Sequence, residues 1–463
     1  MLGQPAAYAA MKDSGLAWIG EVPEHWQQRK LRTVLRQVAE RNRPDLPLLS
    51  VVREKGVILR DVANREENRN VVPDDLSNYK VVRPGQLALN KMKAWQGSYG
   101  VSLFDGVVSP AYFVFDVEDV TPEFLHLALR SRAYVPFFAQ ASEGVRVGQW
   151  DLSSSGLKEI PFLVPTPAEQ KAISRYLRYL DSRILVHARS KQQLVSLLAS
   201  EHKAAVDQLV LRGLRPLTPS RASGVNWIGE IPAHWDVLRA KYLFREVDDR
   251  TATGAETHLS MSQRLGLVPS DMVEERTLVS ESYAGGKLCK TGDLVLNRLK
   301  AHLGVFAVAR QDGVISPDYT VLRPCRPLSV DYYEAVLRSN ACRAEFRVRA
   351  KGIVEGFWRL YTDDFYDIRL PVPPLDEQME IARSLQSRAT ALESVTSRAE
   401  REIELLREYR VRMVVDVVTG KRDVTAVAAA LPDVLENIGI IEQELDEAQC
   451  ARGDAPMEDL DGD

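Results

Sequence analysis

The residue types that perform catalysis or bind metals occur in this sequence, but they do not form the patterns that such chemistry requires. None of the four cysteines lies in a C-x-x-C pair, so neither a zinc site nor a disulfide framework is indicated. The cysteines are Cys289, Cys325, Cys342 and Cys450. The sequence contains no N-P-P-[YF] or D-P-P-Y tetrapeptide for amino-methyl transfer, no G-x-x-x-x-G-K-[ST] phosphate loop and no H-E-x-x-H zinc motif. It therefore predicts a chain that is not itself an enzyme and that holds no cofactor of its own.

The nearest approach to a nuclease site is Asp45 followed by Glu54 and Lys55. The second carboxylate and the lysine are adjacent here, whereas a nuclease constellation alternates them. In the second copy of an internal repeat, the residues corresponding to Glu54 and Lys55 are Arg264 and Leu265, which cannot bind a metal. We therefore do not assign nuclease activity to these residues.

That internal repeat has an offset of about 208 residues and covers most of the chain. Four blocks of the first half return in the same order in the second half. They are SGLAWIGEVPEHW (14–26) and SGVNWIGEIPAHW (223–235), GQLALNKMKAWQG (85–97) and GDLVLNRLKAHLG (292–304), DGVVSPAY (105–112) and DGVISPDY (312–319), and VPTPAEQKAI (164–173) and VPPLDEQMEI (372–381). Matches of this length in one order exclude chance, so the chain is a duplicated unit.

Both copies of the repeat have the same internal pattern. Each begins with about 150 residues in which short alternating runs such as QLALN predict strands and runs such as TPEFLHLALRSRAY predict helices. A proline-rich segment closes this globular part. A stretch without proline or glycine follows at 168–212 and at 376–419, and it ends at Gly213 and Gly420, where a helix C-cap is expected.

Apolar residues recur in both stretches at spacings of 3, 4 or 7 residues, or at sums of these. These positions are Ile173, Leu177, Leu180, Ile184, Leu194, Leu198 and Ala205 in the first stretch, and Ile381, Leu385, Leu392, Val395, Leu406 and Met413 in the second. The pattern predicts two long amphipathic helices, each of which covers the apolar stripe of the other. The polar residues along these stripes either set the register of the pair or point to water. They are His187, Lys191, Arg388 and Glu402.

A globular unit followed by a long helix, with both then repeated, resembles the specificity subunits of type I restriction-modification systems. The resemblance extends from about Ser14 to about Asp423 and rests on the W-I-G-E-[VI]-P-x-H-W, L-x-L-N-[KR]-x-K-A, S-P-x-Y and P-x-x-E-Q blocks, each of which occurs twice. It implies that each globular unit reads one half of a split site in double-stranded DNA. It also implies that the paired helices hold the units apart and dock two adenine-methylating subunits that use S-adenosylmethionine. Restriction subunits that need ATP and Mg²⁺ are expected to join that core.

We therefore predict an α+β chain in which two similar mixed α/β target-recognition domains are separated by two long, antiparallel coiled-coil helices. The predicted segments are an N-terminal extension (1–13), a first target-recognition domain (14–165), a first spacer helix (166–213), a second target-recognition domain (214–373), a second spacer helix (374–422) and an acidic C-terminal tail (423–463).

Basic residues that both copies share are candidates for contacts with the DNA backbone. Two halves that read different bases still face identical phosphates, so shared cations suit phosphates and unshared residues suit bases. Lys91 corresponds to Arg298, and Lys93 corresponds to Lys300, directly after the strand-like LALN and LVLN runs. The alternative is a solvated turn, or a cation that binds neighbouring carbonyl groups.

Residues that differ beside these cations are candidates for base reading. Trp95 faces His302, and Gln96, whose amide can pair with adenine, faces Leu303. Packing in the core is the alternative role for Trp95.

A second candidate for base reading is the loop at 144–150, which corresponds to 352–358. In it Arg146 and Gln149 differ from the second copy, where Glu355 occurs; Arg suits guanine and Glu suits the amino group of cytosine. Trp150 and Trp358 are shared and are expected to anchor the loop in the core.

The shared histidines His25 and His234 could suggest a metal site. Each copy has one histidine and no second ligand beside it, so a structural cap is the better interpretation. The shared Asn90, Asn297, Ser109 and Ser316 are predicted to be turn and capping residues.

Composition and charge are those of a folded chain that can bind DNA. Hydrophobic residues make up 45% and charged residues 27% of the sequence. The net charge is -4, but residues 1–423 alone carry a net charge of +6, since 11 acidic residues and one basic residue lie in 424–463. No apolar run is long enough to span a membrane and no signal peptide is evident, so a cytoplasmic location is expected.

Two other classes of protein remain possible at this point. One is the recognition part of a fused restriction or methylation enzyme, although the sequence lacks the motifs for it. The other is a coiled-coil interaction scaffold that binds no DNA. The sequence does not indicate the bases of either half-site, the length of the spacer or the role of the acidic tail.

Overall fold

The computed structural model describes residues 5–53, 55–60, 75–143, 150–215, 217–262, 265–273, 283–350 and 359–432. The chain forms two compact units. The described part of the first unit comprises the residues up to Lys191 and those from Glu400 onward, and the second unit comprises Gln192–Ala399. Each unit therefore combines one globular part with a part of both long helices, and each is described separately below.

The first unit is built on a four-stranded antiparallel sheet whose order is β4-β11-β8-β9. Its strands are β4 (Leu35–Val38), β11 (Phe113–Val117), β8 (Leu87–Leu89) and β9 (Tyr99–Val101). All three residues of β8 are buried, as the apolar LAL run requires. Antiparallel pairs of strands surround the sheet: β1 (Met11–Asp13) with β2 (Glu21–Pro23), β3 (Gln27–Lys30) with β14 (Pro161–Val164), β5 (Leu49–Val52) with β6 (Gly56–Leu59), β7 (Lys80–Val82) with β10 (Gly106–Val108), and β12 (Ser142–Glu143) with β13 (Asp151–Leu152).

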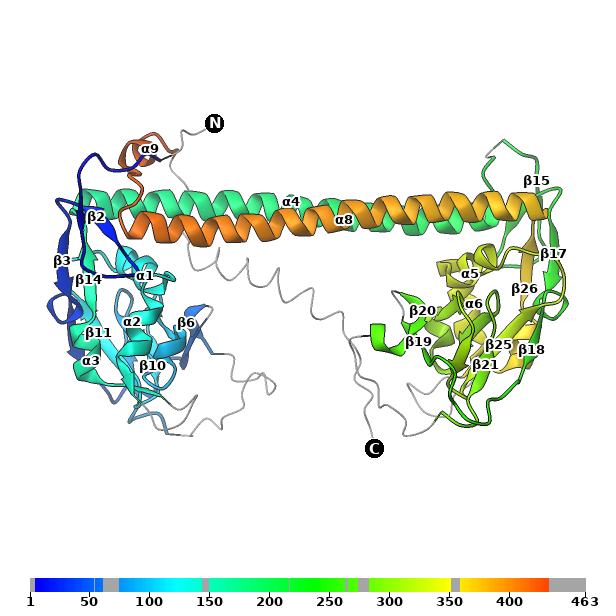
Figure 1. The fold of residues 1–463 in the computed structure, drawn as a ribbon, viewed down its shortest axis with the longest axis horizontal. Coiled ribbons are helices and arrows are strands. Elements are labelled where there is room, and N and C mark those ends of the chain that lie inside the picture. The colour runs from blue at the N-terminus through cyan, green and yellow to red at the C-terminus, as the bar shows by residue number, and fades with distance from the viewer. Residues whose placement is uncertain are drawn as a thin grey trace. The chain divides into compact units, whose positions relative to one another are not determined.

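Short helices complete the core of the first unit (Figure 1). They are α1 (Pro122–Arg130), α2 (Val135–Gln140), α3 (Ser154–Glu159) and the 3-10 turns η1 (Leu31–Thr33) and η2 (Ala94–Gln96). Helix α1 begins with proline at its first position, and it buries one apolar face that includes Phe124 and Leu125.

The second unit repeats this arrangement, except that the β12–β13 pair has no counterpart among its described residues. Its sheet has the order β18-β25-β22-β23, formed by β18 (Phe244–Val247), β25 (Tyr319–Pro324), β22 (Leu294–Asn297) and β23 (Phe306–Val308). The paired strands are β15 (Ser220–Ala222) with β16 (Glu230–Pro232), β17 (Asp236–Arg239) with β26 (Arg369–Val372), β19 (Leu259–Ser262) with β20 (Gly266–Pro269), and β21 (Lys287–Cys289) with β24 (Gly313–Ile315). Its shorter helices are α5 (Val330–Arg338), α6 (Asn340–Arg349), α7 (Thr362–Tyr366), η3 (Ala240–Tyr242), η4 (Ser270–Met272) and η5 (Arg298–Leu303).

The two long helices predicted from the apolar spacing are present as α4 (Pro167–Arg212) and α8 (Leu375–Val418), so the predicted fold class is confirmed. Gly213 and Gly420 follow them with φ angles of 75° and 74°, in the left-handed region that favours glycine at a helix C-terminus. A Cβ atom on Gly420 would also lie 2.2 Å from Pro23 Cδ, so no larger residue fits there. The limits of the globular domains stay predictions.

The glutamine of each P-x-x-E-Q block fastens the start of a long helix to the globular part. Gln170 is almost fully buried, and its amide donates a hydrogen bond to the carbonyl oxygen of Pro165 at 3.0 Å. Its oxygen accepts a hydrogen bond from the backbone N–H of Thr121, the residue that precedes α1. Gln378 makes the same two bonds in the second unit, to Pro373 and from Ser329.

Within the first unit, the initial part of α4 runs antiparallel to the last part of α8. Arg410 forms two hydrogen bonds with the buried carboxylate of Asp181, at 2.7 and 2.9 Å. About three turns further along α4, Lys191 pairs with Glu402 at 2.6 Å. Two of the four polar residues predicted along the stripes therefore join the helices and set their register.

In the second unit, Arg388 of α8 pairs with Glu201 of α4, at 3.4 Å. The remaining predicted polar residue, His187 in the first unit, is exposed to solvent.

The prediction that the apolar stripes are continuous is wrong at two positions. Leu194 and Val395 are 45% and 37% exposed. Each lies ten residues after a buried position, Ile184 or Leu385. At 3.6 residues per turn, a residue ten positions further along points about 80° away, around the helix axis, from the first residue. Positions separated by 3 plus 7 residues therefore move off the surface where the two helices meet.

Both ends of the described chain contribute structure to the first unit. Residues Met11–Asp13, expected in an extension, form β1 and pair with β2. The tail was predicted to lie outside the repeat from about residue 423, and the helical character expected after Pro432 lies outside the described residues. Among the described residues of the tail, helix α9 (Thr425–Ala429) lies before Pro432, and Val424, Ala428 and Leu431 are buried in the core of the first unit. Their spacing of four and three residues places them on one helix face, which is why they can pack together.

Candidate nucleic-acid interface

The turn that carries the shared cations is held by its asparagine in both units. Asn90 Oδ1 accepts a hydrogen bond from Met92 N at 3.2 Å, and Asn297 Oδ1 accepts one from Leu299 N at 3.1 Å. The serines of the S-P-x-Y blocks act similarly, since Ser109 Oγ accepts from Ala111 N and Ser316 Oγ accepts from Asp318 N. The prediction that these four residues are turn residues is confirmed.

The first pair of shared cations is held by different partners in the two units. Lys91 Nζ lies 2.7 Å from Asp151 Oδ2. Arg298 Nε donates to the backbone oxygen of Asp318 at 2.8 Å, and its Nη2 lies 3.8 Å from the Asp318 carboxylate. About a third of each cationic side chain is still exposed, so both can face a phosphate as well as their own partner. Their assignment to phosphate contacts stays a prediction.

Of the second pair of shared cations, the structure describes the side chain of Lys93 alone. Lys93 is exposed, and no ion pair joins it to a carboxylate in the described ranges. The side chain of Lys300 lies outside the described residues, as does that of His302. Lys93 is therefore the clearest candidate among the four for a charge that is free to meet a phosphate.

Trp95 packs against Trp150, and the ring centroids are 5.1 Å apart. Trp95 is half-buried, and its Nε1 has no hydrogen-bond partner within the described ranges. This contact joins the 94–96 turn to the residues just before β13 and agrees with the packing role considered for both tryptophans. Gln96 beside it is half-buried. The other base-reading candidates, Arg146, Gln149 and Glu355, lie outside the described residues, as does Trp358.

The histidines of the repeated opening are part of a hydrogen-bonded cluster, as the structural interpretation predicted. In the first unit, His25 Nε2 lies 2.9 Å from Glu169 Oε1, and Trp26 Nε1 donates to the same oxygen at 3.0 Å. In the second unit, His234 and Trp235 bind Glu377 at 2.8 and 3.1 Å. No group of three or more metal-ligating side chains is found among the residues that the structure describes.

The electrostatics of Glu169 fit this role. Burial opposes ionisation of the carboxyl group, but hydrogen bonds from Thr166, Trp26 and His25 outweigh that effect and lower its pKa to about 2. Thr166 precedes α4 and exchanges bonds with Glu169, which is the capping-box arrangement of a helix N-terminus. The glutamate therefore caps α4 and binds the opening segment at once.

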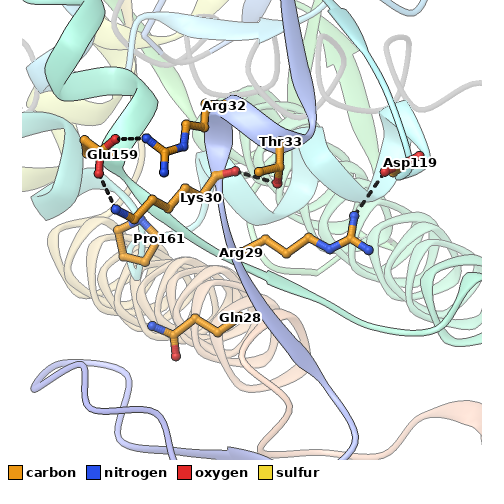
Figure 2. Close-up of a pocket in the computed structure, with 8 residues that line it drawn as sticks. All are labelled: Gln28, Arg29, Lys30, Arg32, Thr33, Asp119, Glu159 and Pro161. Atoms are coloured by element: carbon orange, nitrogen blue, oxygen red, sulfur yellow. Dashed lines mark hydrogen bonds and ion pairs between the residues drawn. The ribbon is translucent and has the colours of Figure 1, made fainter.

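A cleft of about 580 Å³ lies beside β3 and η1 in the first unit (Figure 2). Three basic side chains line it, but each is paired: Arg29 with Asp119 at 3.1 Å, and both Lys30 and Arg32 with Glu159. The second unit keeps one of these pairs as Arg239 with Asp367. Because every one of these three cations is already paired with a carboxylate, we assign no ligand to this cleft.

A pair of buried lysines was missed in the sequence. Lys80 begins β7 and Lys287 begins β21, and they are 8% and 3% exposed. The offset of 207 that aligns Lys91 with Arg298 also aligns these two, so the repeat contained the signal.

The chain thus contains two similar α/β units and two long helices that run antiparallel where they meet in the first unit, and solved structures share this fold. The HsdS subunit from Thermoanaerobacter tengcongensis has this fold: the TM-score is 0.53 at 16% sequence identity, over 86% of this chain and 98% of that one. A chain from a structure that describes complex assembly and conformational transition of the type I R-M system gives a TM-score of 0.58 at 14% identity, with the same coverage.

A relative found by sequence is also described as a type I specificity subunit. The chain is 20% identical, over 429 residues, to the MjaX specificity subunit of Methanocaldococcus jannaschii, which is assigned to the type I restriction enzymes. The match covers 87% of this chain and 95% of the relative. No family model matches the chain. The resemblance to type I specificity subunits that the repeated blocks indicated is thus confirmed. Among the described residues, no helix is long and apolar enough to cross a membrane.

Proposed function

We propose that this chain is the DNA-binding specificity subunit of a type I restriction-modification complex. In this role it reads a bipartite target in double-stranded DNA and directs adenine methylation and restriction by partner subunits. The chain itself is non-catalytic in this proposal. S-adenosylmethionine, ATP and Mg²⁺ are then bound by the two methylating subunits and by the restriction subunits.

The proposal rests on one observation: the two units share their framework, but their residues differ in the turn after the L-x-L-N strand. Both units have the same sheet order and the same Glu–His–Trp cluster. The turn after the L-x-L-N strand keeps its asparagine, whereas Trp95 and Gln96 are replaced by His302 and Leu303. Two readers of different base sequences need such a pattern, because the phosphate backbone is constant while the base edges vary.

Exposed apolar side chains on the long helices support the docking of partner subunits. In the first unit, Val186 of α4 is 54% exposed, and Leu405 and Tyr409 of α8 are 46% and 45% exposed. Leu405 and Tyr409 are four residues apart and share one face of α8. Apolar surface of this kind on a paired helix favours a protein partner.

The test is to express the chain with its methylating partner and to map methylated adenines across the host genome. We expect methylation within one motif made of two half-sites and a fixed spacer, and none when the chain is omitted. Binding of random duplex DNA, measured by gel shift, provides the second readout. If neither the chain nor its complex binds DNA under any condition, the protein is an interaction scaffold and the proposal is wrong.

A further inference from the structure

The buried lysines Lys80 and Lys287 occupy the same place in the two units. Each is the first residue of its strand, and each strand pairs with the strand that follows the L-x-L-N hairpin. A buried ammonium group loses its hydration and therefore needs a counter-charge or strong hydrogen bonds nearby. The two units meet this need in different ways.

In the second unit, two carboxylates supply the counter-charge. Lys287 Nζ lies 3.5 Å from Glu246 Oε1 and 3.5 Å from Asp248 Oδ1. Asp248 also binds Arg250 at 3.1 Å. The cations at this place in the second unit are therefore already neutralised by residues of the chain.

In the first unit, both carboxylates are missing. When β4 is aligned with β18, Gln37 replaces Glu246 and Ala39 replaces Asp248. Lys80 Nζ donates to the backbone oxygen of Tyr112, and no ion pair joins it to any carboxylate in the described ranges. Burial, followed by the positive charges of Arg41 and Lys91, lowers the pKa of Lys80.

Two cations, Arg41 and Lys91, therefore act on Lys80, and Lys91 is itself paired with Asp151 at 2.7 Å. Arg41 is exposed, and its guanidinium donates to the side chain of Asn78. About a third of the Lys91 side chain is exposed. Arg41 binds Asn78, two residues before Lys80, and Tyr112 accepts hydrogen bonds from Lys80 and from Asn90, the residue before Lys91. An anion at this place would therefore meet all three cations, with Lys80 in a site less screened than open solvent.

We propose that Arg41, Lys80 and Lys91 form a binding site for a phosphodiester group of DNA, and that only the first unit has it. This inference rests on the proposed DNA-binding function. The second unit keeps the lysine but fills the site with Glu246 and Asp248. The two halves of the chain therefore grip the DNA backbone unequally, and more of the salt dependence of binding belongs to the first unit.

The experiment transfers the two carboxylates into the first unit of the full chain. The variant Gln37→Glu with Ala39→Asp should pair Lys80 and flatten the slope of log affinity against log salt, for non-specific duplex DNA, by about one unit. Arg41→Gln, at an exposed position, should flatten the slope by a similar amount. The matched control is the reverse change, Glu246→Gln with Asp248→Ala, which should steepen the slope.

The melting temperature of each variant shows whether a change in salt slope comes from misfolding. The Gln37→Glu, Ala39→Asp variant gains ion pairs and should melt no lower than wild type. If wild type binds DNA and both first-unit variants keep its slope, the site is refuted while the proposed function stands. If wild type binds no DNA, the proposed function fails and the DNA assignment of the site fails with it. A rise in melting temperature with inorganic phosphate at constant ionic strength, lost in the carboxylate variant, would then identify free phosphate as the occupant.

Discussion

The Glu169 carboxylate accepts a hydrogen bond from the indole nitrogen of Trp26 across 143 residues of sequence. Glu377 and Trp235 repeat this contact in the second unit. Trp26 and Trp235 are essentially fully buried, so each bond joins a helix N-terminus to the core of the unit that contains it.

Glu169→Gln should destabilise the first unit. The glutamine can accept fewer hydrogen bonds than the carboxylate, so donors from Trp26 or Thr166 lose their partner, at a cost of about 1–3 kcal/mol. Differential scanning calorimetry of the full chain should show a lower melting temperature for this variant and for Glu377→Gln. Glu21→Gln, at an exposed position in the same opening segment, is the control and should melt like wild type. Wild-type melting of Glu169→Gln would contradict the role of this cluster.

The same carboxylate predicts a dependence of stability on acid pH. Its pKa is lowered from 4.5 to about 2 in the folded chain, so the unfolded state binds the proton more tightly. The stabilisation by Glu169 is therefore complete above about pH 4.5 and is lost as the pH falls toward 2. Melting temperature measured between pH 6 and 3 should fall more steeply for wild type than for Glu169→Gln. Parallel curves would mean that the carboxylate is not ionised preferentially in the folded state.

The sequence predicted the fold because duplication revealed it. The repeated blocks, the stretches without proline or glycine and the apolar spacing located both long helices, and the Asn and Ser turn residues were identified from local chemistry. Contacts between distant segments were beyond this approach. To recognise the role of Glu169, one must know that β3 pairs with β14. To recognise the difference around Lys80, one must know the register of β4 with β11. Leu194 and Val395 were misplaced because spacing alone does not correct for drift around a straight helix.

The Asp181–Arg410 pair predicts a non-additive pair of mutations. Asp181 is almost fully buried, so Asp181→Leu alone, which removes this carboxylate from Arg410, and Arg410→Met alone, which removes this guanidinium from Asp181, should each cost about 3–5 kcal/mol of unfolding free energy. Asp181→Leu combined with Arg410→Met replaces both charges by apolar groups and should return stability to near the wild-type value. Urea denaturation of the single and double variants measures this. If the double variant is as unstable as the sum of the singles, the pair contributes more than charge neutralisation.

Lys93 and Lys91 should respond differently to truncation. Lys93→Ala should flatten the salt slope of DNA binding by about one unit and leave melting unchanged, because the side chain is exposed and joins no described carboxylate. Lys91→Ala also breaks the pair with Asp151 and should lower stability by less than about 1 kcal/mol. Both variants should weaken binding to all DNA sequences equally, since phosphates carry no base identity. An unchanged slope for Lys93→Ala would assign this turn to structure alone.

Gln96→Leu tests whether the turn after β8 reads bases. It gives the first unit the residue that the second unit has at this position, Leu303, and it leaves the contact between Trp95 and Trp150 in place. A glutamine that pairs with a base edge contributes about 1–3 kcal/mol of discrimination, so its loss should relax the sequence requirement at one base pair of one half-site. The other half-site should be unchanged.

Mapping of methylated adenines in cells that express the variant with its methylating partner gives both half-sites in one measurement. Leu303→Gln is the matched variant in the second unit and should alter only the other half-site. If both half-sites persist in both variants, these residues do not read bases, and if both half-sites change together, the two units do not read DNA independently.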